Sequence, residues 1–475
     1  MSQIAIPVRE YALVFATAAL VTFLATGGVR LVATRIGAVT PIRDRDVHRL
    51  PTPRMGGVAL YLGVAAAILL ARNMPTLGRA FESSSSVQGV LAAGGVIALV
   101  GVLDDRFDLD AVTKLFGQIL AAGVLVLYGV TWITVWLPSS DGGSVWSFSQ
   151  AQGALITVLI TVVLANAMNF IDGLDGLLAG VATIAASAVF VFSVHQFSVS
   201  GDDSIGAQAP LIAAALIGAC LGFLPHNFFP ARIFMGDSGS MFIGLATAAA
   251  IVTAGGQLNP DSAPNFGGRS TVALLSPVIV VLAVVFIPLL DFLLAVIRRT
   301  KEGRHPFSAD KRHLHHRMLA IGHTHRQAVL IFYLWAFVLS AGSVSLVFAR
   351  WQAVVAPTAV AIVCALAISM WPLMKGRRLE RHRRTAAPPS SLRWLGKWPT
   401  VGEDPGREQS EARRRSRSQH RRRAAGRRPE PDRRCLVVAT SDHLLDGAGS
   451  GRSRARRGRS PRVRWPGGGR SGPHH

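Results

Sequence analysis

Two adjacent carboxylates are the first residues in this sequence whose types and spacing suggest chemistry. Asp104 and Asp105 directly follow an apolar run that ends at Leu103. Adjacent carboxylates repel each other, and at the edge of a membrane segment they are costly unless a cation or a substrate compensates them. A solvated helix end would explain one of them. The pair, with Asp108 one turn further on, favours a role in holding a metal ion or a phosphate.

A second acidic segment, NAMNFIDGLDG over residues 166–176, lies between two apolar runs. Asn169, Asp172 and Asp175 recur every three residues, so on a helix or in a tight turn we expect them to share one side. A glycine follows each aspartate and leaves room for a ligand. Asx turns between two membrane segments are the alternative. They do not explain why so many oxygen ligands stand in so apolar a stretch.

Two basic segments could contact phosphate groups. The first spans residues 48–57 and combines His48 and Arg54 with glycines that allow close backbone approach. A positively charged loop at the start of a helix is its alternative reading. The second spans residues 304–316, begins at Arg304 and ends in a group of three histidines, His313, His315 and His316. Histidines can contact metal or phosphate. Zinc is an alternative, but no cysteine lies nearby, and the abundant aspartates suit magnesium better.

The last polar segment, over residues 227–240, contains Asp237 between glycine and serine residues at the start of an apolar run. Its carboxylate could bind a metal ion. A helix N-cap is the alternative for a lone aspartate in this position.

Membrane-spanning helices must position these residues. Half of the 475 residues are apolar, and the mean hydropathy is +0.37, which is typical of a membrane protein. Apolar runs of about 17–25 residues predict an all-α polytopic protein. We expect eleven transmembrane helices, near residues 11–32, 56–71, 87–103, 115–134, 153–170, 176–194, 209–225, 240–256, 271–297, 327–349 and 352–374.

The predicted loops differ in their content of lysine and arginine. Loops after odd-numbered runs hold 16 of these residues, whereas the N-terminal segment and the loops after even-numbered runs hold five. The positive-inside rule then predicts an N-terminus outside and a C-terminus in the cytoplasm. This topology brings all five polar segments to the cytoplasmic face. Most of them are acidic, histidine or glycine signals, so their meeting on one face indicates a shared active site.

The net charge of +23 is concentrated at the C-terminus. Residues 375–475 hold 28 lysines and arginines against nine acidic residues, and apolar clusters are almost absent beyond residue 385. Such a composition cannot bury enough surface to fold. We therefore expect a catalytic membrane domain over residues 1–374 and a basic, disordered cytoplasmic tail over residues 375–475. Nonspecific contact of the tail with acidic lipid or RNA, or a reading-frame artefact, are the alternatives; we expect no specific nucleic-acid partner.

The segments PTPRMGG, LDDRFDLD, NFIDGLDG, FMGDSGS and HLHH occur in that order. Together they resemble the polyprenyl-phosphate N-acetylhexosamine-1-phosphate transferase family, over about residues 10–374. The HLHH segment with its upstream arginines is similar to the branch of GlcNAc-1-phosphate transferases of WecA type. The phospho-MurNAc-pentapeptide translocase branch carries three successive histidines followed by an aromatic-acidic pair, which is absent here. That branch also often has a lysine near the first motif, where this chain has His48, Arg49 and Arg54.

The resemblance implies roles for individual residues. It makes Asp237 the principal magnesium ligand, and Asp104 and Asp105 an acidic pair near the lipid phosphate, with Asp105 also a candidate metal ligand. Other residues would act at the nucleotide, the metal or the diphosphate, namely Asn169, Asp172, Asp175, His313, His315 and His316. Residues near the uracil would be Gly173, Leu174, Asn227 and Phe234. Further substrate contacts would come from His48, Arg54 and Arg304.

The implied reaction joins UDP-GlcNAc and a polyprenyl phosphate, undecaprenyl or decaprenyl, to give polyprenyl-diphosphate-GlcNAc and UMP. This would be the first membrane step of cell-envelope glycan assembly, in the inner membrane of a bacterium. We expect a multi-pass enzyme that uses magnesium, with manganese as an alternative, and a homodimer is one assembly to consider. Phospho-MurNAc-pentapeptide transfer to the same lipid class is the alternative reaction. A transporter is a rival class, but its site would lie near the midplane between internal repeats. A nucleic-acid-binding membrane anchor is suggested by the tail alone.

Overall fold

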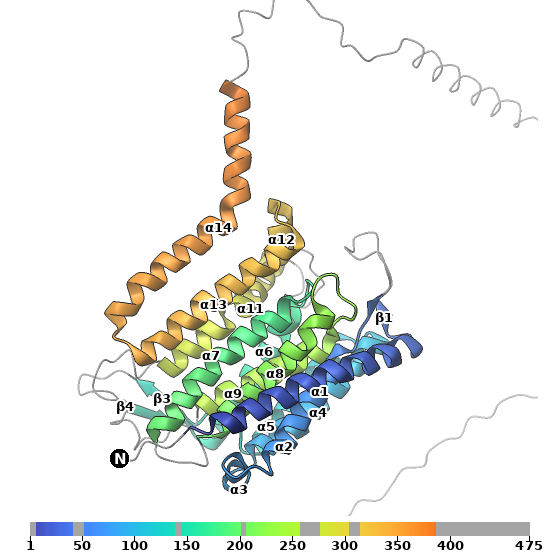
Figure 1. Ribbon diagram of the computed structural model, residues 1–475, viewed down its shortest axis with the longest axis vertical. Helices are drawn as coiled ribbons and strands as arrows, with labels where there is room; N and C mark the ends of the chain where they lie inside the picture. Colours follow the sequence, from blue (N-terminus) through green and yellow to red (C-terminus); the bar gives the residue numbers. More distant parts are fainter. Residues whose placement is uncertain are drawn as a thin grey trace, which may run out of the picture. The chain divides into compact units, whose positions relative to one another are not determined.

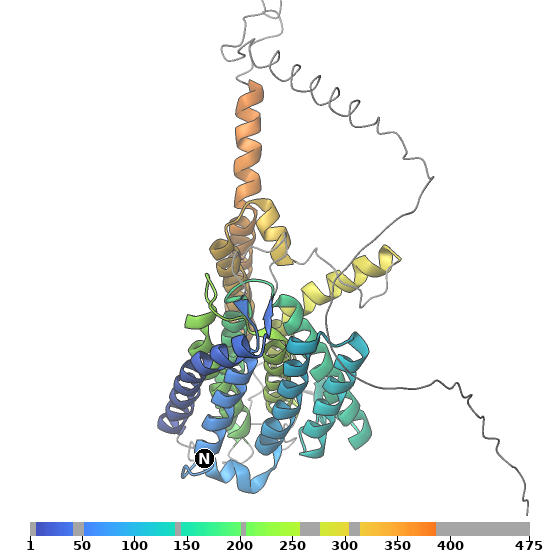
Figure 2. The same ribbon diagram turned by 90° about the vertical axis from the view of Figure 1, so that its right-hand side faces the viewer.

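The computed structural model describes residues 6–40, 52–137, 144–200, 206–256, 276–303 and 314–385. The chain divides into two compact units, Met1–Ala387 and Pro388–His475. The second unit lies outside the described residues, and so does the predicted disorder beyond residue 385. The first unit is mostly helical, as the sequence predicts, and its long helices run side by side (Figures 1 and 2).

The long helices are α1 (Val8–Arg35), α2 (Gly56–Ala71), α4 (Ser86–Phe107), α5 (Ala111–Leu127), α6 (Gln150–Ile171), α7 (Leu177–Ser200), α8 (Gln208–Asn227), α9 (Gly236–Gly255), α11 (Ser276–Lys301), α13 (His325–Phe348) and α14 (Trp351–Thr385). Shorter elements are η1 (Leu77–Arg79), α3 (Ala80–Ser83) and α12 (Leu314–Ile321). Two small antiparallel sheets pair β1 (Val39–Thr40) with β2 (Thr52–Pro53) and β3 (Thr134–Leu137) with β4 (Ser144–Ser147).

Each of the eleven predicted apolar segments overlaps a helix in the described part of the chain. Among the described residues, eight helices are long and apolar enough to cross a membrane, namely α1, α4, α6, α7, α8, α9, α13 and α14. Helices α2 and α5 are apolar but shorter. The chain is therefore a polytopic membrane protein, whereas eleven crossings and their orientation remain predictions.

The two predicted boundaries that differ most from the structure are the ends of the fourth and the last segment. The fourth segment was expected to continue to residue 134, but α5 ends at Leu127 and Gly129 adopts a left-handed backbone with φ of +86°. This conformation suits glycine and ends a helix, so the chain turns away and begins β3 at Thr134. The last segment was expected to end at residue 374, but α14 continues to Thr385 and contains Pro357 and Pro372. Prolines remove backbone hydrogen bonds from a helix, and α14 changes direction along its length (Figure 1).

Helix α9 forms the core of the unit, and its apolar stretch is entirely buried. Small residues let its neighbours approach closely, as is common where membrane helices pack. A Cβ atom added to Gly101 of α4 would overlap the backbone of Ser238, and one added to Gly57 of α2 would overlap the backbone of Gly239. The start of α9 is therefore held against α2 and α4, two helices that carry predicted site motifs at their ends.

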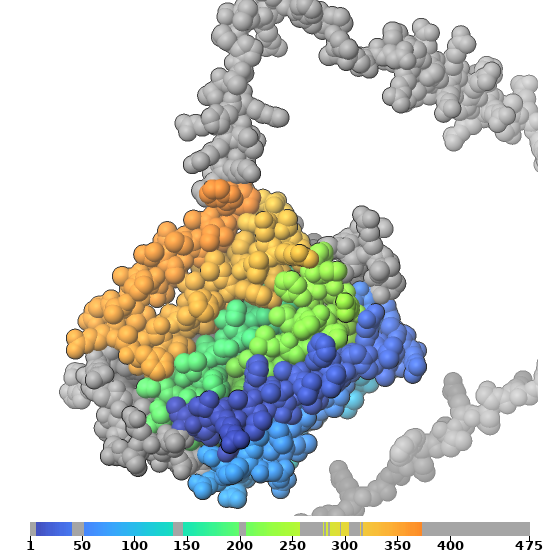
Figure 3. Space-filling view, in the orientation of Figure 1, coloured from blue at the N-terminus to red at the C-terminus, as the bar shows by residue number. Residues whose placement is uncertain are grey.

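Helix α1 lies along the surface of the unit, on the face shown in Figure 3. It runs in the same direction as α8, because Phe15 lies against Gly218 and Ala19 lies against Gly222. The C-terminal ends of both helices therefore lie at the same end of the bundle. The described parts of the predicted motifs belong to this end: α1 leads toward β2 and Arg54, and α8 leads toward the start of α9.

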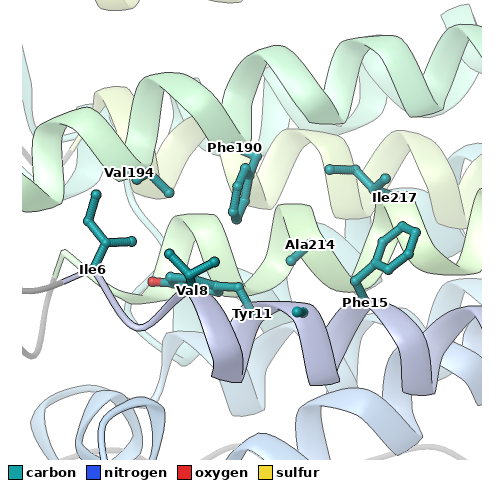
Figure 4. A pocket seen from close by; sticks show the side chains of 9 residues that line it. Ile6, Val8, Tyr11, Phe15, Phe190, Val194, Ala214 and Ile217 are labelled. Carbon is teal, nitrogen blue, oxygen red and sulfur yellow. The ribbon is translucent and has the colours of Figure 1, made fainter.

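An apolar cavity of about 360 Å³ lies at the other end of the bundle, between α1, α7 and α8 (Figure 4). Tyr11 and Phe190 meet edge to face across it, with ring centroids 5.4 Å apart. The side chains that line the cavity carry no charge. Because a nucleotide or phosphate needs charged or polar partners, this cavity is not a site for the anionic substrates that the motifs suggest.

Candidate active site

The two carboxylates of the acidic pair at the end of α4 have different partners. The Oδ1 atom of Asp104 accepts a hydrogen bond of 2.8 Å from the backbone of Leu109, and its Oδ2 atom lies 2.7 Å from Nζ of Lys114. The turn between α4 and α5 returns the chain, so that α5 brings its lysine back to the end of α4. Asp104 is therefore buried but paired with a cation.

Asp105 points to the start of α9. Its Oδ1 atom accepts a 2.9 Å hydrogen bond from the backbone of Asp237. Its Oδ2 atom accepts bonds from the backbone and the hydroxyl of Ser238, at 3.2 and 2.8 Å. The first backbone N–H groups of a helix lack intrahelical partners, and the N-cap residue Met235 supplies no side-chain bond here. Asp105 thus caps α9 from a different helix. Its assignment to the metal remains a prediction.

Asp237 is not the N-cap of α9, which was the alternative for this residue. It lies in the first turn of α9, and its Oδ2 atom lies 2.9 Å from Nζ of Lys114. The lysine ammonium group therefore lies between the carboxylates of Asp104 and Asp237. Without the ammonium group, the two carboxylates would give this point a strongly negative potential.

In the sequence, Lys114 is one positive charge of a predicted loop, and that reading does not reveal its position between the carboxylates of Asp104 and Asp237. The signal was present: it is a single lysine at the start of an apolar helix, ten residues after Asp104. An ionisable residue in such a setting is a functional candidate by default.

Asp104, Asp105 and Asp237, with Lys114 between two of them, form what we call the acidic cluster. The segment that begins at Asn166 lies partly beside this acidic cluster. Asn169, in the last turn of α6, donates a 2.9 Å hydrogen bond to the hydroxyl of Ser240 on α9. Asp172 follows the end of α6. Burial, and then the charges of Asp237, Asp105 and Asp175, raise the pKa of Asp172 to about 8, whereas Arg54 acts in the opposite direction. Because burial is the largest cause, the raised pKa marks Asp172 first as a buried carboxyl group and second as a neighbour of other acidic groups.

Asn169, Asp172 and Asp175 do not lie on one continuous helix, and Asp175 has its own hydrogen-bond partner in another loop. Helix α6 ends at Ile171, and the chain then turns before α7 begins at Leu177. Oδ2 of Asp175 accepts a 2.9 Å hydrogen bond from the backbone of Ala231, and the side chain is buried. The turn directs Asp175 to the loop between α8 and α9, while its charge still acts on Asp172.

The predicted uracil residues differ in their access to a ligand. Gly173 is exposed and Phe234 partly exposed, whereas Leu174 and Asn227 are buried. The amide of Asn227 accepts a 3.0 Å bond from the backbone of Gly176 and donates a 3.1 Å bond to the carbonyl of Ile233. In this structure Asn227 therefore joins the turn at Gly176 to the segment at Ile233.

The first motif packs directly against the start of α9. The backbone of Phe234 donates a 2.8 Å bond to Pro53, and the carbonyl of Phe234 accepts a 3.1 Å bond from Gly56. This pairing places Arg54 near the cluster, where its guanidinium lies 3.9 Å from the exposed carboxylate of Asp108. Its predicted partner His48 lies outside the described residues.

The histidine motif is described only in its backbone. His313 and Arg304 lie outside the described residues, and His315 and His316 belong to α12, whose described features do not include these two side chains. The backbone of Leu314, the first residue of α12, donates a 2.9 Å bond to Oδ1 of Asp291 on α11. Asp291 is buried, and it could have been noticed in the sequence as an acidic residue within an otherwise apolar run.

The described residues offer oxygen atoms of the kind that bind a magnesium ion. No three histidine, cysteine or acidic residues in the described part of the chain are arranged to hold an ion by themselves. Magnesium, however, is usually bound by one or two carboxylates together with substrate phosphates and water. The oxygen-rich cluster offers Asp237, with Asp172 and Asn169 nearby. The donor set therefore fits a hard divalent cation.

The fold and the cluster define a class of protein, namely a polytopic membrane protein with a polar site where several helix ends meet. A family model described as Glycosyl transferase family 4 matches residues 87–255. A protein of Mycolicibacterium smegmatis named decaprenyl-phosphate N-acetylglucosaminephosphotransferase is 50% identical over 370 residues, which cover 78% of this chain and 90% of the relative. The chain therefore belongs to glycosyl transferase family 4, and its resemblance to the GlcNAc-1-phosphate transferase branch is confirmed.

More distant relatives carry similar names. A Bacillus subtilis protein named as a probable undecaprenyl-phosphate N-acetylglucosaminyl 1-phosphate transferase is 32% identical, with 70% of this chain and 84% of that protein covered. An Escherichia coli undecaprenyl-phosphate alpha-N-acetylglucosaminyl 1-phosphate transferase is 28% identical, with 66% and 77% covered. The similarity thus extends across relatives named for two different polyprenyl lipids.

Proposed function

We propose that this protein transfers N-acetylglucosamine-1-phosphate from UDP-GlcNAc to a polyprenyl phosphate and releases UMP. The names of its relatives support this reaction. The single observation that carries it is the position of Lys114, whose ammonium group lies between Asp104 and Asp237, where two of the five motifs meet. A phosphate that enters the site could take up this cation, because its oxygens compete with carboxylates for the same donor.

The reaction forms a bond between an oxygen of the lipid phosphate and the β-phosphorus of UDP-GlcNAc. The bond from that phosphorus to the oxygen that bridges the two phosphates breaks, and UMP leaves with the electron pair. Both reactants are anions, so their repulsion is the main obstacle. Lys114 and Arg54 can lower it by holding phosphate oxygens while the groups align.

A strong general base is not required. A phosphate monoester has a second pKa of about 6, so much of the lipid phosphate is already dianionic at neutral pH. Asp104 faces Lys114 and would serve mainly to orient it, with at most a minor part in proton transfer. We therefore assign most of the rate enhancement to positioning and charge.

Magnesium would be held by Asp237, with Asp172 and Asn169 beside it. When bound, it would neutralise charge on the diphosphate of the donor. Manganese offers the same preference for oxygen ligands and is the alternative ion. Gly173, which directly follows Asp172, is exposed, and the nucleotide would lie there.

We place the site on the cytoplasmic face of a bacterial inner membrane, on the basis of the distribution of lysine and arginine. Decaprenyl phosphate is the favoured acceptor, because the 50% identical relative is named for it. A homodimer remains an assembly to test by mass measurement of the detergent-solubilised protein.

The test is transfer by purified membranes that contain the protein. Labelled UDP-GlcNAc should yield a lipid-linked product and UMP when decaprenyl phosphate is added, and labelled UDP-MurNAc-pentapeptide should yield none. The opposite preference would support the alternative reaction, phospho-MurNAc-pentapeptide transfer. Transfer from neither donor, in membranes where the protein is correctly inserted, would exclude both reactions.

A further inference from the structure

Side chains from two other segments hold the backbone of the turn that contains Asp175 and Gly176. The N–H group of Asp175 donates a 3.1 Å hydrogen bond to Nε2 of His325. The N–H group of Gly176 donates to the amide oxygen of Asn227, and the carbonyl of Gly176 accepts a bond from the hydroxyl of Tyr333. Three neighbouring backbone groups of one turn are thus bound by side chains.

Gly176 explains why the turn needs such support. Its φ of +77° lies in the left-handed region, and a Cβ atom in its place would meet the ring of Phe228 at 2.9 Å. Glycine has the largest conformational freedom to lose on folding. The side chains that bind this backbone therefore help select one conformation among many.

His325 belongs to none of the five motifs. It is the first residue of α13, a helix that packs beside α7 (Figure 1). Since Asp175 donates the hydrogen bond, Nε2 must carry a lone pair, and the bond requires the neutral tautomer protonated at Nδ1. The imidazole also stacks on Phe229, with ring centroids 4.5 Å apart and an angle of 28° between the rings. Stacking fixes the plane of the ring and so aims Nε2 at the turn.

The held turn lies directly after the exposed segment that we assign to the nucleotide. Asp172 and Gly173 precede Asp175 by three and two residues, so a change in the turn shifts both of them. Asp175 adds a second attachment, because its carboxylate accepts the backbone N–H of Ala231. The loop between α6 and α7, the loop between α8 and α9, and the start of α13 are thereby joined at one point.

We propose that His325 is a positioning residue that holds the Asp172–Gly176 turn in the conformation that binds the nucleotide of the donor. The proposal rests on the proposed function, since it assigns the turn to UDP-GlcNAc. It does not make His325 a catalytic residue, because its ring bonds to the backbone of Asp175 and not to a substrate.

Two substitutions separate the hydrogen bond from the stacking. His325→Phe keeps an aromatic ring on Phe229 but has no acceptor, and His325→Gln supplies an amide acceptor near the position of Nε2. The matched control is His323→Phe, two residues earlier, where the imidazole Nε2 lies 3.0 Å from the carbonyl of Ser369 on α14. This control removes a similar histidine contact, and its partner helix, α14, carries none of the five motifs.

We expect His325→Phe to raise the KM for UDP-GlcNAc roughly tenfold, the effect of one lost hydrogen bond, and to leave the KM for decaprenyl phosphate unchanged. His325→Gln should recover most of the loss, and His323→Phe should behave as wild type. Hydrogen–deuterium exchange of residues 171–180 should be faster in His325→Phe alone. The exchange experiment needs no activity and tests the hydrogen bond directly.

Three results would overturn the proposal. Unchanged exchange in His325→Phe would show that the hydrogen bond does not hold the turn. Faster exchange with wild-type kinetics would show that the turn does not position the donor. Equal changes in both KM values, with no recovery in His325→Gln, would indicate a general structural role. Failure of the proposed function would instead appear as wild-type protein without transfer activity, whatever the exchange of the turn.

Discussion

Lys114 and Asp237 are separated by 123 positions in the chain, yet Nζ of the lysine lies 2.9 Å from Oδ2 of the aspartate. The same ammonium group lies 2.7 Å from Asp104. One cation therefore joins the end of α4, the start of α5 and the start of α9. Phosphate groups that enter this point would meet a positive charge that is already positioned.

Lys114→Met should lower transfer by about 100-fold, because one positioned charge that stabilises a transition state typically contributes this much. Lys301→Met, a change of the same type at an exposed position in the last turn of α11, should leave the rate within a few-fold of wild type. Initial rates in membranes with matched protein content would measure both. A Lys114→Met enzyme with the wild-type rate would remove this lysine from the mechanism.

Asp237→Asn should abolish magnesium-dependent transfer without loss of insertion. The amide keeps the size of the side chain but lacks the charge that a hard cation requires. Asp110→Asn is the matched control, because Asp110 is an exposed N-cap of α5 and asparagine also caps helices. Rates are measured over a series of magnesium concentrations. If the variant kept the wild-type magnesium dependence, Asp237 would not be a metal ligand.

Asp105→Ala should destabilise the protein more than it changes the chemistry of any single step. The change leaves the N–H groups of Asp237 and Ser238 and one hydroxyl without an acceptor in a buried setting, which costs about 2–4 kcal/mol. We expect a lower melting temperature in detergent. Asp108→Asn, at the exposed C-cap of the same helix, keeps a side chain that tolerates the left-handed backbone there and should melt as wild type. Equal melting of the two variants would contradict the capping role of Asp105.

Asp291→Ala should reduce transfer several-fold, because α12 loses the acceptor that binds its first backbone N–H group. Asp291→Asn retains an acceptor oxygen and should keep most of the activity. Ser149→Ala removes the cap of α6 at its N-terminal end, the end away from Asn169, and is the control for the general effect of a lost cap. Equal activity in Asp291→Ala and Ser149→Ala would show that the start of α12 does not matter for transfer.

The sidedness of the site can be tested with single cysteines in a variant that lacks Cys220, Cys364 and Cys435. If 16 positive charges against five set the topology, a cysteine at Ser308 should react with an impermeant thiol reagent only after the membrane is opened. A cysteine at Ser140 should react in intact cells. Labelling of the Ser308 position from outside would place the site away from the cytoplasm and contradict the proposed use of UDP-GlcNAc.

The amino-acid sequence by itself determined the class of protein and the segments that carry chemistry. Apolar runs predicted the helices because helix length and membrane hydropathy are local properties. The motifs with Asp104, Asn169 and Asp237 could be recognised because polar residues stand out in apolar surroundings. Residues at these positions do lie close together in the structure.

Only the tertiary structure decided which partner each polar group has. Asp105 caps a helix that begins 131 residues later, Lys114 bridges two carboxylates, and Asp175 is turned to Ala231. The sequence could not show these pairings, because they depend on which helix ends meet. Those meetings are set by the close packing of small residues such as Gly101 against α9, a contact between segments far apart in the chain.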